Sequence, residues 1–461
     1  MTLRFQHAGF NGHVGVARAD ITPPVGIYAR NWGAAKHDAA TGIHRPLNLT
    51  ALVIKETPDG APLVLVDADL GWWRSLKLER RFRAGVIERF KLDAARYIFA
   101  LTHTHAGPLL TDHVELHWQG GELIEPYFQH LEETTHRVIA EALKAVQPAV
   151  IEWNIGRCQL ATERDLADPA KPDQRRICGF NPTAKADDTL LVGRVSGADG
   201  KLLAVIANYA CHPTTLAWDN KLISPDYVGA MRETIERDCP GAVALFLQGA
   251  SGDLAPRMQY VGDTSVADGH GRQLGHAVLA TLAGMEPSGQ RLKFDGAMES
   301  GAPLAIWNRE PAQYFSTLGA INPSIELPLK DWPTADEFEA QRKAANDRVL
   351  EERFRRKRDI RRGLGDGKSY PLPIWLWRIG DAVLVANMCE AYSSIQQHLR
   401  EQFPDSPLLY LNLANGSVGY LPPQNRYDED VYQSWQTPFD KGSLERLETG
   451  IAAELKKWTA K

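Results

Sequence analysis

Two histidines, His103 and His105, close an apolar run and are followed at once by Gly107 and Pro108. On a β-strand, side chains at positions i and i+2 point to the same face, so a strand over residues 96–104 would direct both imidazoles to one side. Neutral imidazoles bind zinc and also act as acids or bases. The pair therefore indicates a metal site or a catalytic centre rather than two unrelated surface histidines.

Three later segments have the same form, with an apolar run that ends in a polar residue at a break. They end in His212 before a proline, in Glu390, and in Tyr420 before two prolines. Zinc requires three or four protein ligands, which the first pair of histidines cannot supply alone. His212 is therefore a candidate ligand, although each of these residues in isolation is more typical of packing or capping.

A fourth segment, Gln248 to Asp253, reads Q-G-A-S-G-D after an apolar run. It is similar to the nucleophile elbow G-x-S-x-G, but it lacks the final glycine, and Pro256 leaves no room for a helix after Ser251. The pattern favours a loop whose backbone N–H groups and Asp253 line a cleft over a serine nucleophile at Ser251.

Taken together, seven short motifs resemble those of the neutral/alkaline (non-lysosomal) ceramidase family, in the family order. They are A-D-I-T-P-P, H-T-H-A-G-P, N-Y-A-C-H-P-T-T, L-I-S-P-D-Y, G-D-L-A-P, N-M-C-E and G-Y-L-P-P, and they extend from Gly15 to about Tyr427. The resemblance implies a zinc amidase that cleaves the N-acyl bond of ceramides. It further implies that zinc is held by His103, His212, Glu390 and Tyr420.

The resemblance also assigns roles around the metal. His105 would contact the substrate carbonyl or relay a proton. Two imidazoles, a carboxylate and a phenolate are suitable zinc donors, and the cation would activate water and polarise the scissile carbonyl. Because a ligating histidine needs an acceptor partner, we expect further residues to support the ligands, orient the substrate or, for the first of them, take part in catalysis: Asp253, Asp226, Asp69, Ser251 and Gln248.

The chain departs from the family pattern at several points. Ala255 stands where the family has a serine to which the resemblance assigns a catalytic part, and alanine has no hydroxyl. The run after H-T-H is also changed, and we expect neither the signal peptide nor the C-terminal β-sandwich domain of the secreted members. We therefore predict a zinc-dependent hydrolase of an amide, with ester or lactone as alternatives, on a substrate other than ceramide.

Two other classes of function stay open. The metal could orient a sugar or polyol for isomerisation, elimination or glycoside cleavage, with Trp72 and Trp218 among the tryptophans available for stacking. Alternatively, the chain is a binding homologue that lost catalysis with the serine at position 255. A metallo-β-lactamase site is disfavoured, because Gly107 and Pro108 stand where H-x-H-x-D-H requires Asp and His.

Composition limits the partners. The chain has 461 residues, a formal net charge of −5 and 44% hydrophobic residues, which is enough for a sizeable core. Because no linker or repeat is obvious, we expect one compact unit over 1–461, and as an enzyme it would act on a small molecule. The charge argues against a nucleic-acid binder, and no apolar run suggests membrane insertion. Five widely spaced cysteines are typical of a reducing, cytoplasmic setting. A homo-oligomer is left open.

Short β-branched runs alternate with helical patterns, which predicts an α/β fold with a mixed β-sheet covered by helices. Strands are expected over 49–56, 63–69, 96–104, 150–155, 190–195, 203–209, 243–248, 374–385 and 408–413. Helices are expected over 75–90, 126–146, 226–238, 269–282, 393–402 and 443–458.

Residues 335–362 predict one long charged helix, with seven cations near its end: Arg353, Arg355, Arg356, Lys357, Arg358, Arg361 and Arg362. The helix dipole favours cations at a C-terminus. A solvated surface helix is the favoured interpretation, and a phosphate or subunit contact is the alternative. Because a strand leading to Glu390 follows, this segment is also a candidate insertion that shapes the cleft.

Overall fold

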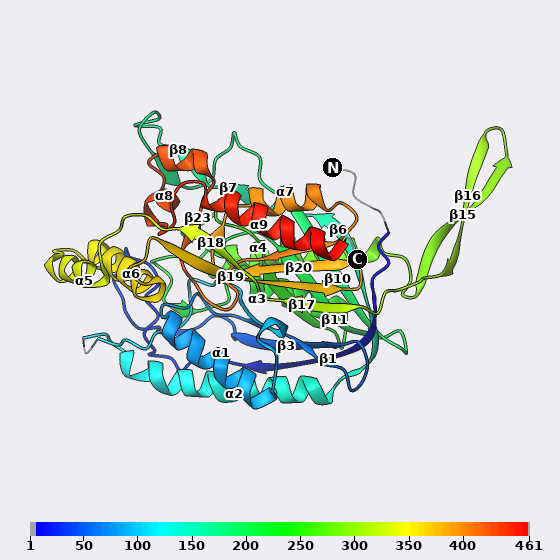
Figure 1. Cartoon of the computed structure of the whole chain (residues 1–461), viewed down its shortest axis with the longest axis horizontal. Helices are drawn as coiled ribbons and strands as arrows, with labels where there is room; N and C mark the ends of the chain where they lie inside the picture. Colours follow the sequence, from blue (N-terminus) through cyan, green and yellow to red (C-terminus); the bar gives the residue numbers. More distant parts are fainter. Residues whose placement is uncertain (1–5, 116, 460–461) are drawn as a thin grey trace.

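The computed structural model describes residues 6–115 and 117–459, and in it two β-sheets pack face to face with helices on both outer faces (Figure 1). The first sheet has eight strands in the order β13 (Val243–Gln248), β11 (Leu202–Tyr209), β10 (Thr189–Gly197), β6 (Gln147–Arg157), β1 (Phe10–Asp20), β3 (Asn48–Lys55), β4 (Leu63–Ala68) and β5 (Tyr97–Leu101). The second sheet contains β17 (Leu318–Ile321), β19 (Ser369–Ile379), β20 (Ala382–Asn387) and β22 (Leu408–Leu411), with β18 (Ser324–Pro328) also paired to β19. The mixed α/β fold predicted from the sequence is confirmed.

Alternation along the strands explains the layers. In β3, Leu52 and Ile54 belong to the core between the two sheets, whereas Ala51 and Val53 pack toward the outer helices. The outer face of the first sheet is covered by α1 (Leu76–Phe90), α2 (Ile124–Lys144), α3 (Tyr227–Asp238) and α4 (Thr264–Ala283). The second sheet is flanked by α7 (Ser394–Gln402) and α9 (Ser443–Thr459). None of the described helices is both long and apolar enough to cross a membrane.

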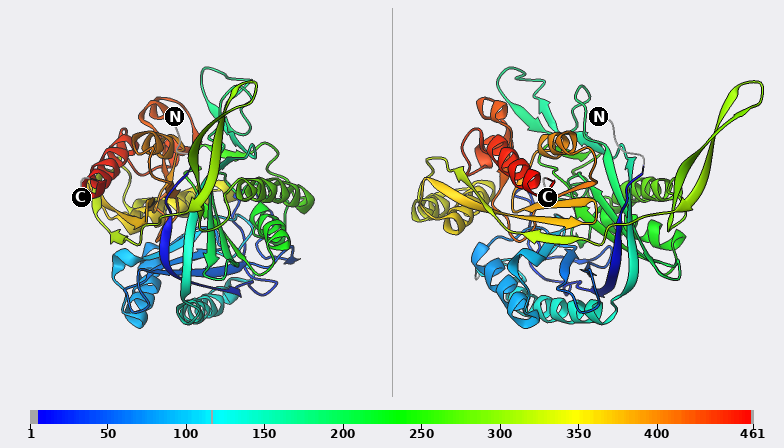
Figure 2. Two further views of the ribbon diagram at one scale, coloured as in Figure 1. Left: turned by 90° about the vertical axis from the view of Figure 1, so that its right-hand side faces the viewer. Right: turned by 45° about the vertical axis from the view of Figure 1, so that its right-hand side comes forward.

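The remaining elements are short or project from the body. Small two-stranded pairs join β2 (Gly42–Ile43) to β12 (Leu222–Ile223), β7 (Ala161–Glu163) to β14 (Leu254–Pro256), β8 (Asp165–Ala167) to β9 (Arg176–Cys178), and β21 (Glu390–Ala391) to β23 (Tyr420–Leu421). A short helix, α8 (Tyr432–Gln436), lies near β23. The hairpin of β15 (Gln290–Glu299) and β16 (Pro303–Pro311), which sequence analysis did not anticipate, extends away from the body (Figures 1 and 2).

The two edge strands of the first sheet, β5 and β13, approach each other. Arg232 of α3 closes this junction, because it donates to Asp67 in β4, to Asp69 just after β4, and to the carbonyl of Ala244 in β13. Asn415, in the loop after β22, binds the backbone of β5 on its free edge. The carboxyl ends of β5, β11 and β20 are thereby brought to one place.

The single helix expected over 335–362 is wrong: the segment forms α5 (Ala335–Ala344) and α6 (Arg348–Leu364). Ala345 leaves the helical conformation with ψ of 134°. Asp347 then caps α6, accepting hydrogen bonds from its first N–H groups. An aspartate side chain satisfies donors that have no partner inside the helix, so it starts a new helix rather than continuing the old one.

The strand expected over 374–385 is also two elements, the antiparallel strands β19 and β20. The chain reverses at Gly380, which has φ of 64° and lies against the backbone of Gly9, so that a Cβ there would clash. Only glycine adopts this conformation at no steric cost. Both strands are largely apolar up to the turn, so the sequence pattern does not separate them.

Candidate metal centre and active site

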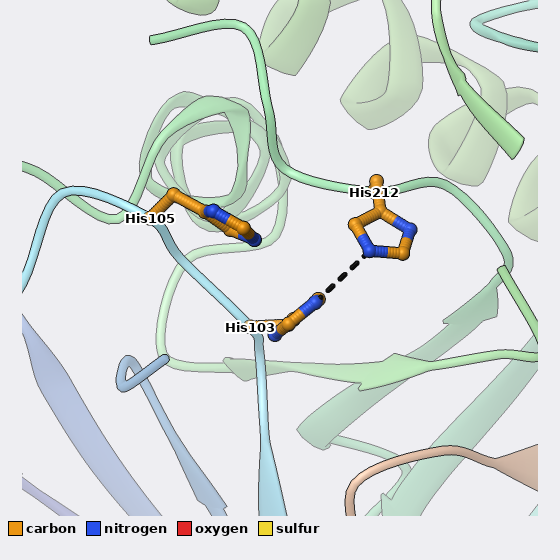
Figure 3. Close-up of side chains that lie close together, drawn as sticks. All are labelled: His103, His105 and His212. Carbon is orange, nitrogen blue, oxygen red and sulfur yellow. Dashed lines mark hydrogen bonds between the residues drawn. The ribbon is translucent and has the colours of Figure 1, made fainter. Parts of the chain in front are cut away.

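His103 and His105 lie in a loop and not on a strand, because β5 ends at Leu101. His103 has φ of 71°, in the left-handed region, and its N–H donates to the carbonyl of Leu70 at 2.9 Å. The expected strand over 96–104 is therefore too long. The two imidazoles still lie together, with ring centroids 4.8 Å apart (Figure 3). A non-glycine residue held in this backbone region is often part of a functional site.

Three side-chain donor atoms converge from three different strand ends. Nε2 of His103 lies 3.0 Å from Nε2 of His212, which follows β11 (Figure 3). Oε2 of Glu390, which follows β20, lies 3.2 Å from the first of these nitrogens and 3.1 Å from the second. All three side chains are buried. The structure thus brings together residues separated by more than a hundred positions in the chain.

Hydrogen bonds to backbone carbonyls determine which ring nitrogens carry the protons. Nδ1 of His103 lies 3.1 Å from the Gly71 carbonyl, and Nδ1 of His212 lies 2.6 Å from the Ser251 carbonyl. Because a carbonyl only accepts, both Nδ1 atoms donate, and both Nε2 atoms present lone pairs. Two lone pairs and a carboxylate oxygen facing one another repel, unless a cation or an extra proton lies between them. The donor set fits a divalent cation.

The spacing of these atoms also suits a metal. Donors on a tetrahedral zinc ion with bonds of about 2.0–2.1 Å are about 3.3 Å apart, which is close to the observed triangle. His105 joins a looser group with His103 and His212, whose nitrogens all lie within 4.8 Å of one another. Neither ring nitrogen of His105 has a hydrogen-bond partner among the described residues. His105 is therefore placed to meet a substrate, while Glu390 completes the closer triangle.

The ionisation of the cluster is consistent with coordination. Burial lowers the pKa of His212 to about 3, with a further contribution from the charge of Arg164. Burial acts to raise the pKa of Glu390, but the imidazoles of His103 and His212 outweigh it and hold that pKa well below its usual value. A neutral imidazole and an ionised carboxylate are the forms that bind metals.

Tyr420 lies beside this triangle. It is the register partner of Glu390 in the β21–β23 pair, and its ring lies nearly parallel to that of His212, with centroids 6.2 Å apart. The hydroxyl is 3.3 Å from Nη2 of Arg164. Burial, followed by the charge of Glu390, raises the pKa of Tyr420 well above its usual value, so the side chain is a phenol until a cation approaches. All four predicted ligands therefore lie in one region.

The expected supporting residues divide into two groups. Ser251 orients His212 through its carbonyl, and Gln248 donates to the Cys211 carbonyl at 2.9 Å and to the Ser251 hydroxyl at 2.6 Å. Asp253 accepts both the N–H and the hydroxyl of Ser393 at 2.7 Å, which ties the Ser251 loop to the segment after Glu390.

Asp69 and Asp226 do not contact the histidines. Asp69 forms an ion pair with Arg232, and Asp226 caps α3 and accepts the N–H of Leu216. Among the residues described, no carboxylate accepts the Nδ1–H of His103 or His212, so these aspartates do not support the histidines in that way. The acceptors are backbone carbonyls, which leave no signal in the sequence because every residue has one.

A cavity of about 500 Å³ opens onto the cluster and is lined by His103, His105, Glu390 and Tyr420. Aromatic rings line the cavity beside His105. The Trp72 and Trp32 rings lie 4.9 Å and 5.0 Å from the His105 ring, and Trp218 stacks on Tyr260 with centroids 5.9 Å apart. Ala255 is fully buried in β14 and does not line the cavity.

Sequence reasoning missed several cavity residues: Trp32, Arg74, Arg164, Tyr260, Glu352 and Tyr432. Each is a single residue in a loop or on a helix, and none belongs to a pattern in the sequence that would indicate a functional site. Arg164 binds the Gly252 carbonyl and Tyr420, and both contacts depend on tertiary packing. Only α6 carries a signal in the sequence, its run of cations, and that run does not show which side chains face the cavity.

Comparison with known proteins gives a consistent result. Residues 13–271 match the family described as neutral/alkaline non-lysosomal ceramidase, N-terminal. Neutral ceramidase of Pseudomonas aeruginosa is 28% identical over 251 residues, covering 53% of this chain and 37% of that protein. Neutral ceramidase of Drosophila pseudoobscura pseudoobscura is 26% identical over 266 residues, covering 53% and 36%. The matched region thus spans less than two fifths of these relatives.

Solved structures show the same fold. A crystal structure of neutral ceramidase from Pseudomonas aeruginosa superposes with a TM-score of 0.64 at 19% identity, covering 96% of this chain and 74% of that one. A ceramidase complexed with C2 superposes with a TM-score of 0.66 at 19% identity, covering 97% and 76%. The likeness extends well beyond the region matched in sequence.

Proposed function

Because this chain belongs to the neutral/alkaline non-lysosomal ceramidase family, we propose that it is a zinc-dependent hydrolase that cleaves an amide bond in a substrate other than ceramide. The observation that carries the proposal is the triangle of Nε2 of His103, Nε2 of His212 and Oε2 of Glu390, with edges of 3.0–3.2 Å. Tyr420 is the fourth proposed ligand. A bound zinc ion would supply Lewis-acid activation of water and of the scissile carbonyl.

The residues around the ion have separate tasks. His105 faces the cavity with both nitrogens unpartnered among the described residues, so it can exchange a proton with the attacking water or the leaving nitrogen. Burial is the largest cause that lowers the pKa of His105 well below its usual value, which keeps the imidazole neutral and able to accept that proton.

Positioning residues hold the reacting groups in place. The guanidinium of Arg164 donates to the Gly252 carbonyl at 2.8 Å and lies against the Tyr420 hydroxyl, which fixes the phenol at the edge of the centre. The indoles of Trp32 and Trp72 cover His105 and exclude bulk water from this side. A dry, prearranged site strengthens electrostatic stabilisation of a developing oxyanion.

Two observations favour a substrate other than ceramide. The chain has alanine at position 255, where the resemblance places a serine with a catalytic part, so the hydroxyl of that serine is missing. The cavity is also lined by four arginines, for which an uncharged ceramide offers no counter-charge: Arg74, Arg164, Arg353 and Arg356. Family membership supports amide hydrolysis, whereas this lining supports a change of substrate.

The test is hydrolysis of a panel of N-acyl compounds that includes long-chain ceramide, acyl amino acids and acyl amino sugars. Products are identified by mass, with His105→Ala as the variant and His276→Ala, an exposed histidine on α4, as the control. We expect release of a free fatty acid and an amine, lost in the first variant and kept in the second. An unchanged substrate mass would point instead to isomerisation, and turnover of ceramide above all other amides would contradict the proposed specificity.

A further inference from the structure

One wall of the cavity is formed by α6, which contributes Arg353, Arg356 and Glu352 to its lining. Arg356 is also held by the fold, because its Nη2 donates to the Asn31 carbonyl at 2.8 Å. α6 is thus not a solvated surface helix, and part of its cationic run faces the proposed active site. These cations favour an anionic ligand only if acidic residues of the protein do not already neutralise them.

Acidic residues of the protein neutralise the cations of the cavity wall only in part. Glu352 accepts from Arg74 at 2.7 Å, from Arg356 at 2.9 Å and from Arg355 at 3.2 Å, so one carboxylate serves three guanidinium groups. Asp359, which also lines the cavity, is paired with Arg358 at 2.8 Å. Since Glu390 belongs to the metal centre, the cavity wall retains a surplus of positive charge.

Arg353 contributes a positive charge that no carboxylate balances among the residues described. Its guanidinium lies over the ring of Trp435, 4.9 Å from the centroid, and no carboxylate within the described ranges pairs with it. The side chain is exposed at the cavity. An arginine stacked on an indole keeps the edges of its guanidinium free, and those edges bind a carboxylate through two parallel hydrogen bonds.

Contacts across the cavity place Arg356 near the reacting groups, and Arg353 lines the same cavity. Arg356 lies 5.2 Å from the Trp72 centroid, and Trp72 lies 4.9 Å from the His105 ring. On the other side, Nη1 of Arg356 is 3.5 Å from the Tyr432 hydroxyl, and the ring of Tyr432 is 5.4 Å from that of Tyr420. A single aromatic side chain therefore separates Arg356 from His105 on one side and from Tyr420 on the other. Arg353 lies one ring further out, because the ring of Trp435 is 4.9 Å from that of Tyr432.

We propose that Arg353 binds a carboxylate of the substrate, with the charge of Arg356 beside it in the same cavity, so that the amide cleaved belongs to an N-acyl amino acid. This inference rests on the proposed amide hydrolysis and names its substrate class. The apolar acyl chain has the aromatic surface of Trp32, Trp218 and Tyr260 available to it. Neutral N-acyl alcohols offer no partner for the surplus charge.

The first experiment measures binding by calorimetry with two probes that have no scissile carbonyl: decyloxyacetate, a carboxylate, and 2-decyloxyethanol, its neutral counterpart. The zinc-loaded wild-type protein is compared with Arg353→Met, which keeps an apolar stem for Trp435. Arg362→Met is the matched control, because Arg362 is exposed on the same helix and does not line the cavity. We expect the acid to bind about 10- to 100-fold more tightly than the alcohol, as a charge-assisted contact of about 1.5–3 kcal/mol would give.

The preference should disappear in Arg353→Met and persist in Arg362→Met. Equal binding of the two probes to the wild type would overturn the subsite. A preference that survives Arg353→Met would overturn it too, because the carboxylate would then be held elsewhere, for instance by the metal.

The second experiment measures kcat/KM for N-decanoylglycine, N-decanoylethanolamine and N-decanoylphosphoethanolamine. The subsite predicts faster cleavage of the glycine conjugate than of the other two, with the advantage lost in Arg353→Met. Preference for the phosphate compound would overturn the assignment to a carboxylate. If the acid probe binds preferentially but no amide is cleaved, the subsite stands and the proposed hydrolysis fails. If amides are cleaved with no preference for the charged substrate, the proposed hydrolysis stands and the subsite fails.

Discussion

Arg164 holds Tyr420 at the edge of the candidate metal centre, with its Nη2 3.3 Å from the phenolic oxygen and its Cζ 5.7 Å from the ring centroid. Burial and the charge of Glu390 raise the pKa of Tyr420, whereas the guanidinium of Arg164 opposes them. The phenol therefore has the neighbour it needs to become a metal ligand, but not enough positive charge to ionise alone. A bound cation would supply the rest.

Removing that hydroxyl tests the fourth ligand. In Tyr420→Phe the ring can still pack beside Tyr432, so we expect an unchanged melting temperature in chelator. Zinc binding should weaken at least about 10-fold, the low end for disturbed metal sites, as measured by competition with a chromophoric chelator. Tyr314→Phe, which removes a hydroxyl bound to Glu152 elsewhere, is the control. Wild-type zinc affinity in Tyr420→Phe would remove this residue from the ligand set.

Gln248 orients the loop that holds His212, through its hydrogen bonds to the Cys211 carbonyl and the Ser251 hydroxyl. We expect Gln248→Ala to lower zinc affinity by about 10- to 100-fold, because groups that orient ligands typically contribute this much. Gln290→Ala, at an exposed position of the projecting hairpin, should leave it unchanged. Equal zinc affinities in the two variants would show that His212 does not depend on this support.

Asp226 provides a pH-dependent contribution to stability outside the metal centre. Burial raises its pKa from 3.8 to about 6, against the opposing hydrogen bond from the Leu216 N–H. Since the folded-state pKa is higher than the unfolded one, the protonated carboxyl stabilises the fold below pH 3.8, and this contribution is lost as the pH rises through 6.

The measurement compares urea unfolding of the wild type and Asp226→Asn between pH 4 and 7.5. Asparagine at position 226 does not titrate, and the contributions of the other titratable groups cancel in the difference between the two free energies of unfolding. We expect the free energy of unfolding of the wild type to fall relative to the variant by up to roughly 3 kcal/mol, the equivalent of about two pKa units. A constant difference across this pH range would mean that Asp226 has an ordinary pKa.

Glu352 anchors α6 to the body, because it pairs with Arg74 at 2.7 Å in a buried setting. Removing one partner of a buried ion pair leaves the other charge uncompensated, which typically costs about 3–5 kcal/mol. We expect Glu352→Gln to lower the free energy of unfolding by this order and to increase amide hydrogen exchange in α6. Glu141→Gln breaks an exposed pair with Arg137 and should cost less than about 1 kcal/mol. Similar losses in both variants would contradict the anchoring role.

The residues that converge on the candidate metal centre were predicted from the family resemblance, because the local pattern of each one alone is equally typical of packing or capping. His103, His212 and Glu390 follow apolar strands and precede a break, which is where an α/β fold gathers its site. The strand ends were less well placed, since β5 stops at Leu101 and His103 takes a left-handed conformation. The imidazoles meet because the two edges of the sheet approach each other, and that depends on long-range contacts.

The cavity wall was not predictable in the same way. The cations of α6 were visible in the sequence, but their direction depends on the cap at Asp347, which splits the expected helix and lets α6 dock through Glu352 onto Arg74. Trp32 lies in an irregular segment with no periodic pattern around it. Residues of this kind acquire their place only from tertiary packing.

The central claim is that His103, His212, Glu390 and Tyr420 bind one zinc ion on which hydrolysis depends, and the most direct test is the metal content of the purified protein alongside its activity. We predict about one zinc per chain in the wild type and in His276→Ala, and little in His103→Ala or Glu390→Ala. Chelation should abolish amide hydrolysis, and added zinc should restore it. Full hydrolytic activity in a protein shown to be free of metal, or wild-type metal content in both ligand variants, would contradict the account.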